Sequence, residues 1–327
     1  TVVSLAFMRQ LFTFLHTPED LMTETLQYFG TILAGTTITI FNNFAMTLLR
    51  SVGNSRVPLL AMIISAIANV LMDLLFVFPL HMGVLGAALA TVLAQVLSAL
   101  YCCYYIGREK NLIPKKTDWK PQSVIIKRLT LKGLPVAVMN SVTAVGGMVL
   151  QTFVNNMGTS YVAAYAACTK ILSLFEQPAN TVGLALLTFV GQNYGAGKMD
   201  RVHKGVRTCM GITAGATVLL SVILYNYASI CYQLFTTDAQ VVVIGEQILH
   251  FLVPTYFTYI AIEILSGTLR GIGDSWLPMI ICCLGICALR VVWILTAVPL
   301  KNDILTIVFS YPLTWTVTSI AFIVYYV

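Results

Sequence analysis

The sequence predicts an all-α protein that crosses a membrane many times, and three observations support this. Of its 327 residues, 58% are hydrophobic and 10% are charged, and the mean hydropathy is +0.84. Soluble domains average about half apolar and a quarter charged residues. Nine apolar runs each exceed the roughly 20 residues that a helix needs to cross the hydrocarbon core. A loop motif between apolar runs also occurs twice, which indicates a bundle built from two related halves.

The apolar runs follow one another along the chain with short polar connections. After the end of a helix in residues 1–15, they cover 22–48, 57–80, 83–106, 133–155, 161–190, 205–235, 240–269, 276–300 and 303–327. Only helices and closed barrels satisfy their own backbone hydrogen bonds in lipid, and the alternation that marks barrel strands is weak here. We therefore expect about nine complete transmembrane helices plus a partial one.

The duplicated loop has the pattern Leu-Arg-x-x-Gly-Asn/Asp-Ser-x-x-Pro. One copy contains Arg50, Gly53 and Pro58, and the other contains Arg270, Gly273, Asp274 and Pro278 at an offset of 220 residues. In such a loop Arg can bind the last free carbonyls of a helix, Gly permits the turn, Asn, Asp or Ser can cap the next helix, and Pro fits its first turn. Each loop is predicted to join two membrane helices.

The same offset relates other positions, such as Pro79 and Pro299, so the halves correspond over about residues 15 to 80. The second half begins near Leu131, and its counterpart would begin about 90 residues before Thr1. We therefore expect an N-terminally truncated fragment of a two-lobe bundle with six helices in each lobe. The expected domains are an incomplete N-lobe (1–106, the end of helix 3 to helix 6), an inter-lobe linker (107–132) and a C-lobe (133–327, helices 7–12).

Basic residues are concentrated in alternate connections. Of the 19 Lys and Arg residues, fifteen lie around 50–56, 107–132, 198–207 and 270, whereas Arg9 and Lys301 belong to the opposite side. The positive-inside rule places the basic side in the cytoplasm. We expect a multi-pass protein of the plasma (inner) membrane with a cytoplasmic linker. Because the positive-inside bias accounts for the basic linker, we do not expect nucleic-acid binding.

Three motifs occur together in this chain. They are the paired Leu-Arg loops, the run from Val190 to Gly197 that includes Gly191, Gln192 and Gly195, and the pair Asn69 and Asp73. In combination, over the whole chain, they resemble the multidrug and toxic compound extrusion (MATE) family. The resemblance implies two six-helix lobes, alternating access, and export of amphipathic, often cationic compounds in exchange for H⁺ or Na⁺. The family's first helix, with its membrane-embedded aspartate, would precede residue 1.

Asp73 is the strongest candidate for ion coupling. A charge inside a membrane helix costs at least about 2.5–3.5 kcal/mol on insertion scales, so it is a functional candidate by default. Asn69 lies four residues earlier on the same helical face. Removal from water disfavours a charged carboxylate, which favours proton exchange near neutral pH, and oxygens including that of Thr91 suit Na⁺. The resemblance implies that these three residues belong to an N-lobe cation site. Alternatively, Asp73 only hydrogen-bonds between helices and stabilises their packing.

The second half does not repeat this acidic site, because a Trp stands at the position equivalent to Asp73. However, Asn43 is equivalent to Glu263, so we add Asn43 to the candidate cation site. The candidates for contact with substrate or proton are Glu263, Glu176, Lys170 and Arg290. Alternatively, Glu263 forms a static ion pair with Arg290 or Lys170. Aromatic side chains that could line an adaptable cavity are Phe41, Tyr165, Tyr256 and Tyr259.

Three functions were compared with these residues. A cation-coupled antiporter fits best, because three buried acids against two buried bases favour a cationic cargo. A lipid or lipid-linked oligosaccharide flippase of the same superfamily would need a cationic cavity. An intramembrane enzyme would need clustered catalytic groups, whereas the four His residues are scattered. We therefore expect no enzyme and no cofactor beyond the H⁺ or Na⁺ ion, with an organic cation or amphipathic compound as substrate and a monomer in the bilayer.

The Gly-rich run at 191–197 follows no strand and lacks a phosphate-loop ending, so it predicts a helix-to-helix turn.

Overall fold

The computed structural model describes residues 5–14, 19–109, 112–113 and 120–326. Every regular element in these ranges is a helix, which confirms the predicted all-α class. The chain forms two compact units, Thr1–Pro121 and Gln122–Val327. Residues 110–111 and 114–119 of the predicted linker lie outside the described ranges.

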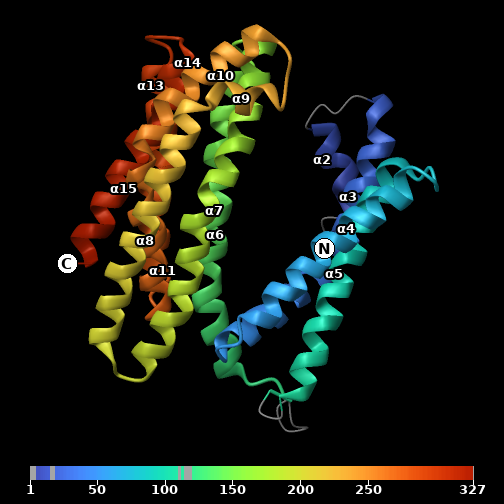
Figure 1. Cartoon of the computed structure of the whole chain (residues 1–327), viewed down its shortest axis with the longest axis vertical. Helices are drawn as coiled ribbons and strands as arrows, with labels where there is room; N and C mark the ends of the chain where they lie inside the picture. The colour runs from blue at the N-terminus through green and yellow to red at the C-terminus, as the bar shows by residue number, and fades with distance from the viewer. Residues whose placement is uncertain (1–4, 15–18, 110–111, 114–119, 327) are drawn as a thin grey trace. The chain divides into compact units, whose positions relative to one another are not determined.

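The first unit has a core of closely packed helices (Figure 1). Its helices are α2 (Met8–Phe14), α3 (Glu19–Ser51), α4 (Arg56–Val77) and α5 (Gly83–Arg108). The last helix packs along both α3 and α4, and its inward face carries small buried residues such as Ala90 and Ala94. Small side chains let helix backbones approach closely in membrane proteins, so α5 joins the other two helices.

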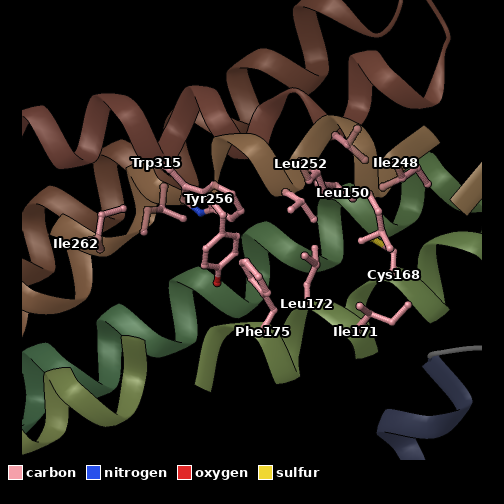
Figure 2. Packing of buried hydrophobic residues seen from close by; sticks show 14 of the residues in the cluster. Leu150, Cys168, Ile171, Leu172, Phe175, Ile248, Leu252, Tyr256, Ile262 and Trp315 are labelled. Carbon is pink, nitrogen blue, oxygen red and sulfur yellow. The ribbon is translucent and has the colours of Figure 1, made fainter. Parts of the chain in front are cut away.

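The second unit contains the remaining helices (Figure 1). They are α6 (Ser123–Asn155), α7 (Thr159–Gly195), α8 (Met199–Asn226), α9 (Ala228–Gln233), α10 (Ala239–Leu252), the 3₁₀-helix η2 (Val253–Tyr259), α11 (Ile260–Gly271), α12 (Trp276–Cys282), the π-helix η3 (Cys283–Ala288), α13 (Leu289–Ala297), α14 (Ile304–Val308) and α15 (Ser310–Tyr326). Its apolar core draws on most of these helices. Figure 2 shows part of this core, with Tyr256 between Phe175 and Trp315.

Eight stretches of helix within the described ranges are long and apolar enough to cross a membrane. Three belong to the first unit and five to the second, where η2 and η3 each lie inside one span. The 37-residue helix α7 is not among the eight. The predicted multi-pass membrane bundle is confirmed, whereas nine complete helices plus a partial one stays a prediction.

Helix α6 includes the last residues of the predicted linker. We expected an apolar run from residue 133 and a linker over 107–132, but one continuous helix covers Ser123–Asn155. The helix starts two residues after Pro121, and no Pro or Gly interrupts residues 123–132. The basic side chains of Lys127, Arg128 and Lys132 therefore extend from its first turns.

The two repeated loops have the same backbone, as the motif predicted. Gly53 and Gly273 have φ angles of 87° and 94°, a region that glycine adopts without steric cost. Their N–H groups each donate to the carbonyl of the motif arginine, Arg50 or Arg270, at 3.0 Å. The Arg270 side chain also donates to a carbonyl one turn earlier at 3.3 Å, as predicted, whereas Arg50 contacts the sulfur of Met62.

The helix that follows each loop is capped by the acidic or amide residue of the motif. The Oδ1 atoms of Asn54 and Asp274 accept hydrogen bonds from the backbone N–H three residues later, at 3.2 and 3.3 Å. Ser55 and Ser275, the other capping candidates, make no such bond. The cap is therefore an Asn or Asp cap, because only that side chain reaches the free N–H groups.

The repeat also extends to the helix ends. Helix α4 starts at Arg56 and ends at Val77, and the equivalent span Trp276–Ala297 has the same offset of 220 residues at both ends. The second copy differs from the first because two of its spans contain non-α segments. These are η2, in the span Ala239–Gly271, and η3, in the span Trp276–Ala297. Pro254, in the first turn of η2, cannot donate a backbone hydrogen bond, and the helix tightens to 3₁₀ geometry there.

The Gly-rich run of residues 191–197 ends helix α7 and turns into α8, as predicted. The N–H of Lys198 donates to the carbonyl of Asn193 at 2.9 Å, and Gly197 has a φ of 71°. A left-handed glycine after the last helical turn is a common helix terminator. A Cβ at Gly191 would only make an ordinary contact, 3.5 Å from the carbonyl oxygen of Gly271.

Helices α7 and α11 meet at glycines. A Cβ added at Gly267 would lie 2.7 Å from the carbonyl oxygen of Gly183, and one added at Gly271 would lie 2.9 Å from the carbonyl oxygen of Leu187. The two α11 glycines are four residues apart on one face, the small-xxx-small spacing that brings membrane helices together. This contact fixes the distance between two walls of the cavity described below.

We expect Gly267→Ala to lower the thermal unfolding midpoint of the purified protein. The added methyl would meet the α7 backbone, which cannot rotate away, and overpacking of this kind costs about 1–3 kcal/mol. The control is Gly215→Ala in α8, where a Cβ meets nothing within 4 Å and alanine improves helix propensity. Equal midpoints for the two variants would contradict the close contact.

Candidate functional site

A cavity of about 530 Å³ lies among α6, α7, α11, α13 and α15 of the second unit. Charged and aromatic side chains on its wall include Glu176, Tyr259, Glu263, Arg290, Tyr311 and Trp315. They come from four segments that are distant in sequence. Three of the four predicted contact residues, Glu176, Glu263 and Arg290, therefore line one cavity.

The aromatic side of this cavity follows from the 3₁₀ geometry of η2. Residues three apart eclipse each other in a 3₁₀-helix, and the rings of Tyr256 and Tyr259 have centroids 5.4 Å apart. Both rings also contact Trp315, at 5.0 and 5.5 Å. Phe175 meets Tyr256 edge-on at 4.5 Å (Figure 2). Tyr256 is fully buried, so Tyr259 and Trp315 of this cluster, together with Tyr311, present the aromatic surface to the cavity.

Glu263 lies where α11 approaches α7. Its Oε1 atom accepts a hydrogen bond of 2.6 Å from the hydroxyl of Tyr259, one turn earlier. Its side chain also borders Gly183, because a Cβ there would lie 3.5 Å from Oε2. A Cβ at Gly183 would also lie 3.1 Å from the backbone oxygen of Glu263, so the two helices are in close contact at this residue.

Glu176 comes from α7 and faces the same cavity. Glu263 lines the same cavity, so two carboxyl groups share this space. The hydroxyl of Tyr256 also lies near Glu176, without a hydrogen bond of good geometry. The site therefore combines two nearby carboxyl groups with tyrosine hydroxyls.

Arg290 is held against α15 rather than by an acid. Its side chain is 5% exposed, and its guanidinium lies 4.4 Å from the centroid of the Tyr311 ring. Nη2 donates to the hydroxyl of Thr314 at 3.3 Å, and the Tyr311 hydroxyl in turn bonds that of Tyr165 at 2.7 Å. A cation over a ring face is stabilised by the ring's quadrupole.

The static ion pairs considered for Glu263 do not form. Within the described ranges the one ion pair joins Lys301 and Asp303 at 3.9 Å, so neither Arg290 nor Lys170 lies within 4.0 Å of the Glu263 carboxylate. Lys170 is exposed on α7 and does not line the cavity. The carboxylates of the cavity thus lack a basic partner at contact distance.

A smaller cavity of about 240 Å³ lies among α3, α4 and α5 of the first unit. Asn69 and Thr91, two of the predicted cation-site residues, line it together with Asn42 and Gln95. Asn42 donates to the Oε1 atom of Gln95 at 2.6 Å, and the hydroxyl of Thr91 donates to the Ala87 carbonyl at 3.0 Å. Amide and hydroxyl groups therefore converge here.

Asp73 is partly buried and is not on the wall of this cavity. Its Oδ1 atom is buried without a hydrogen-bond partner, as is the Nδ2 atom of Asn69 one turn earlier. Unpaired buried polar groups are costly. The pair therefore offers unused oxygen and nitrogen atoms next to the cavity.

A profile named MatE matches residues 1–75 and 135–296 of this sequence. These two segments make up most of the chain. The chain belongs to the MatE family. The resemblance predicted from the paired loops and the Asn69 and Asp73 pair is confirmed at the level of the family.

Relatives of this MatE chain include two proteins of Bacillus subtilis (strain 168). The probable multidrug resistance protein YpnP is 27% identical over 267 residues, which cover 80% of this chain and 59% of the relative. The probable multidrug resistance protein YoeA is 25% identical over 338 residues, which cover 99% of this chain and 72% of the relative. The chain thus spans only part of the length of these relatives.

Solved structures show the same fold. A MOP superfamily transporter from Pyrococcus furiosus has a TM-score of 0.93 at 21% identity, covering 99% of this chain and 73% of that one. An outward-facing multidrug resistance MATE family transporter has a TM-score of 0.92 at 21% identity with the same coverage. The MatE fold is therefore established over nearly the whole chain.

The two cavities of this MatE chain occupy equivalent positions in its repeat. At the offset of 220 residues, six wall residues of the first cavity correspond to wall residues of the second: Asn42 and Ile262, Met46 and Ser266, Met62 and Cys282, Ala66 and Ile286, Thr91 and Tyr311, and Gln95 and Trp315. At equivalent positions, the cavity of the first copy therefore has amide and hydroxyl side chains, and the cavity of the second copy has aromatic rings.

The structure places Asn42, and not the predicted Asn43, on the wall of the first-unit cavity. Asn43 is exposed and does not line the first-unit cavity, whereas Asn42 is 1% exposed and does. Successive helical residues point about 100° apart, so only one of the two can face the cavity. The repeat contained a usable signal, because Asn42 is equivalent to Ile262 on the wall of the other cavity.

Among the aromatic candidates, the structure places Tyr259 on the cavity wall and the others elsewhere. Tyr165 and Tyr256 are buried in the core beside the cavity, and Phe41 is 50% exposed. Gln95 and Trp315 were missed by sequence reasoning. Both lie on the last span of their repeat copy, and neither carries a charge that would have selected it.

Proposed function

We propose that this protein is a cation-coupled antiporter that exports amphipathic, often cationic compounds by alternating access. The observation that carries the proposal is the second-unit cavity, where Glu176 and Glu263 lack a basic partner beside the rings of Tyr259 and Trp315. A carboxylate binds the charge of an organic cation, and an aromatic face binds both its charge and its apolar part.

In the first unit, we assign ion coupling to Asp73 with Asn69 and Thr91. The unpaired Oδ1 atom of Asp73 and the hydroxyl of Thr91 are oxygens of the kind that bind Na⁺, and the same carboxyl group can instead take up a proton. The coupling ion is therefore H⁺ or Na⁺. Asn42 and Gln95 extend the polar wall of the adjoining cavity, and Asn43 is left out of this site.

The flippase alternative has one observation in its favour. Arg270 and Arg290 line the same cavity as the two glutamates, so the wall also offers positive charge to an anionic headgroup. Arg290, however, is already engaged by Tyr311 and Thr314, whereas the carboxylates have no basic partner. Relatives named as multidrug resistance proteins also favour drug export.

Export of ethidium from transport-deficient bacterial cells that express the protein tests this function. We expect faster efflux than in cells with an empty vector, and a return to the vector rate when the gradient of the coupling ion, H⁺ or Na⁺, is collapsed. Collapsing the two gradients one at a time identifies the coupling ion. Efflux equal to the vector control, or efflux that survives the loss of both gradients, would contradict a cation-coupled drug antiporter.

A further inference from the structure

A third cavity, of about 370 Å³, lies between α7 and α8 and shares no wall residue with the two cavities above. It is lined by Phe189, Arg201, Lys204, Gly205, Thr208 and Cys209. Its wall thus has two basic side chains at one end and mostly apolar groups at the other. Asp200, the acid in the same turn of α8, is not part of the wall.

The basic end lies on the outward face of α8. Arg201, Lys204 and Thr208 are exposed and spaced by three and four residues, so they share one helical face. Val202 and Val206 are 1% and 4% exposed and anchor the opposite face in the protein core. The two cations are therefore presented side by side on the outer surface of the second unit.

Phe189 forms the apolar wall because residue 205 is a glycine. A Cβ at Gly205 would lie 3.0 Å from Cδ1 of the Phe189 ring and would overlap other ring atoms. With no side chain in the way, the ring lies against the backbone of α8. This leaves an apolar surface directly beside the two basic residues.

The charge pattern of α8 indicates where the cavity lies across the thickness of the bilayer. Its first turns contain all the charged residues of the helix, and the 19 residues from Thr208 to Asn226 contain none. At 1.5 Å per residue these cover about 28 Å, close to the roughly 30 Å of the hydrocarbon core. The boundary between headgroups and acyl chains therefore falls near Thr208, with Arg201 and Lys204 on the headgroup side and Cys209 on the acyl side.

We propose that this cavity binds an anionic phospholipid, with its phosphate on Arg201 and Lys204 and the start of an acyl chain against Phe189 and Cys209. The two halves of such a lipid match the two ends of the cavity at the matching depth. Basic pockets between membrane helices recognise anionic headgroups by charge, and the phosphate of a neutral phosphatidylcholine is balanced by its own choline. The site therefore discriminates by headgroup charge.

Lipid-dependent thermal stabilisation of the protein in detergent tests this site, with dioleoyl phosphatidylglycerol and dioleoyl phosphatidylcholine titrated separately. We expect phosphatidylglycerol to raise the unfolding midpoint of the wild-type protein more than phosphatidylcholine does. In the variant Arg201→Gln/Lys204→Gln, the apparent affinity for phosphatidylglycerol should fall about 30-fold, because each basic residue near an anionic lipid contributes about a factor of five. Gly205→Leu should lose the same stabilisation without any change of charge, because its side chain fills the cavity.

The matched control is Arg207→Gln, which removes an exposed base from the same turns of α8 but not from the cavity wall. It should keep the wild-type response. The proposal is overturned if Arg207→Gln loses as much as the double variant, if both lipids stabilise the wild-type protein equally, or if inorganic phosphate alone reproduces the effect of phosphatidylglycerol. It is also overturned if Gly205→Leu, monodisperse in gel filtration, responds like the wild-type protein.

Discussion

A Glu263→Gln variant is expected to reach the membrane in normal amounts and to lose coupled ethidium export. The amide has the size of the carboxyl group, and its oxygen still accepts the hydrogen bond from Tyr259, so the local structure is retained. The variant cannot carry a negative charge or exchange a proton. Hydrogen bonds to charged groups contribute about 1.5–3 kcal/mol, so cargo affinity should fall about tenfold or more.

The matched control for this prediction is Glu246→Gln. Glu246 lies in the same membrane span, Ala239–Gly271, but does not line the cavity. Efflux rates in intact cells, normalised to the amount of protein in the membrane, should be near wild type for Glu246→Gln and near the vector control for Glu263→Gln. Wild-type efflux in Glu263→Gln would remove this carboxyl group from the transport cycle.

Much of the fold could be predicted from the sequence, because the physical constraints act locally. Apolar runs of membrane length depend on composition, and the loops around Gly53 and Gly273 depend on turn chemistry. Both features can be read directly from the sequence. Helix type within a span was not predictable. Pro254 disturbs helix geometry, but neither the 3₁₀ geometry of η2 nor the π-helix Cys283–Ala288 has a specific signal in the order of residues.

The candidate sites were predicted less well, because a site depends on which face of each helix turns inward. Charged residues are rare in membrane helices, and this criterion alone selected Glu176, Glu263 and Arg290, which line one cavity. It was insufficient for Lys170, whose long side chain reaches the surface of α7. Uncharged wall residues such as Gln95 carry no such mark, since hydropathy hardly distinguishes an inward polar residue from one that faces a neighbouring helix.

The roles of the two repeat copies diverged at positions that the backbone keeps equivalent. Thr91 corresponds to Tyr311 and Gln95 to Trp315, so the second copy gained rings where the first has small polar groups. Rings suit an amphipathic cargo, whereas amide and hydroxyl oxygens suit a small cation. This difference places the cargo with Glu263 and the coupling ion with Asp73 in the proposed cycle.

An Asp73→Asn variant separates ion coupling from the alternative that Asp73 only stabilises helix packing. If Asp73 served packing, the isosteric amide would preserve most contacts and transport would continue. If it serves coupling, efflux should fall to the vector rate, because asparagine can neither exchange a proton nor neutralise Na⁺. The thermal unfolding midpoint should not fall, since Oδ1 has no hydrogen bond to lose and removing a buried charge lowers a desolvation cost. The matched control is Glu24→Gln, which replaces an exposed acid on α3 and should transport normally. If Asp73→Asn exports ethidium at the same rate as Glu24→Gln, Asp73 has only a structural role.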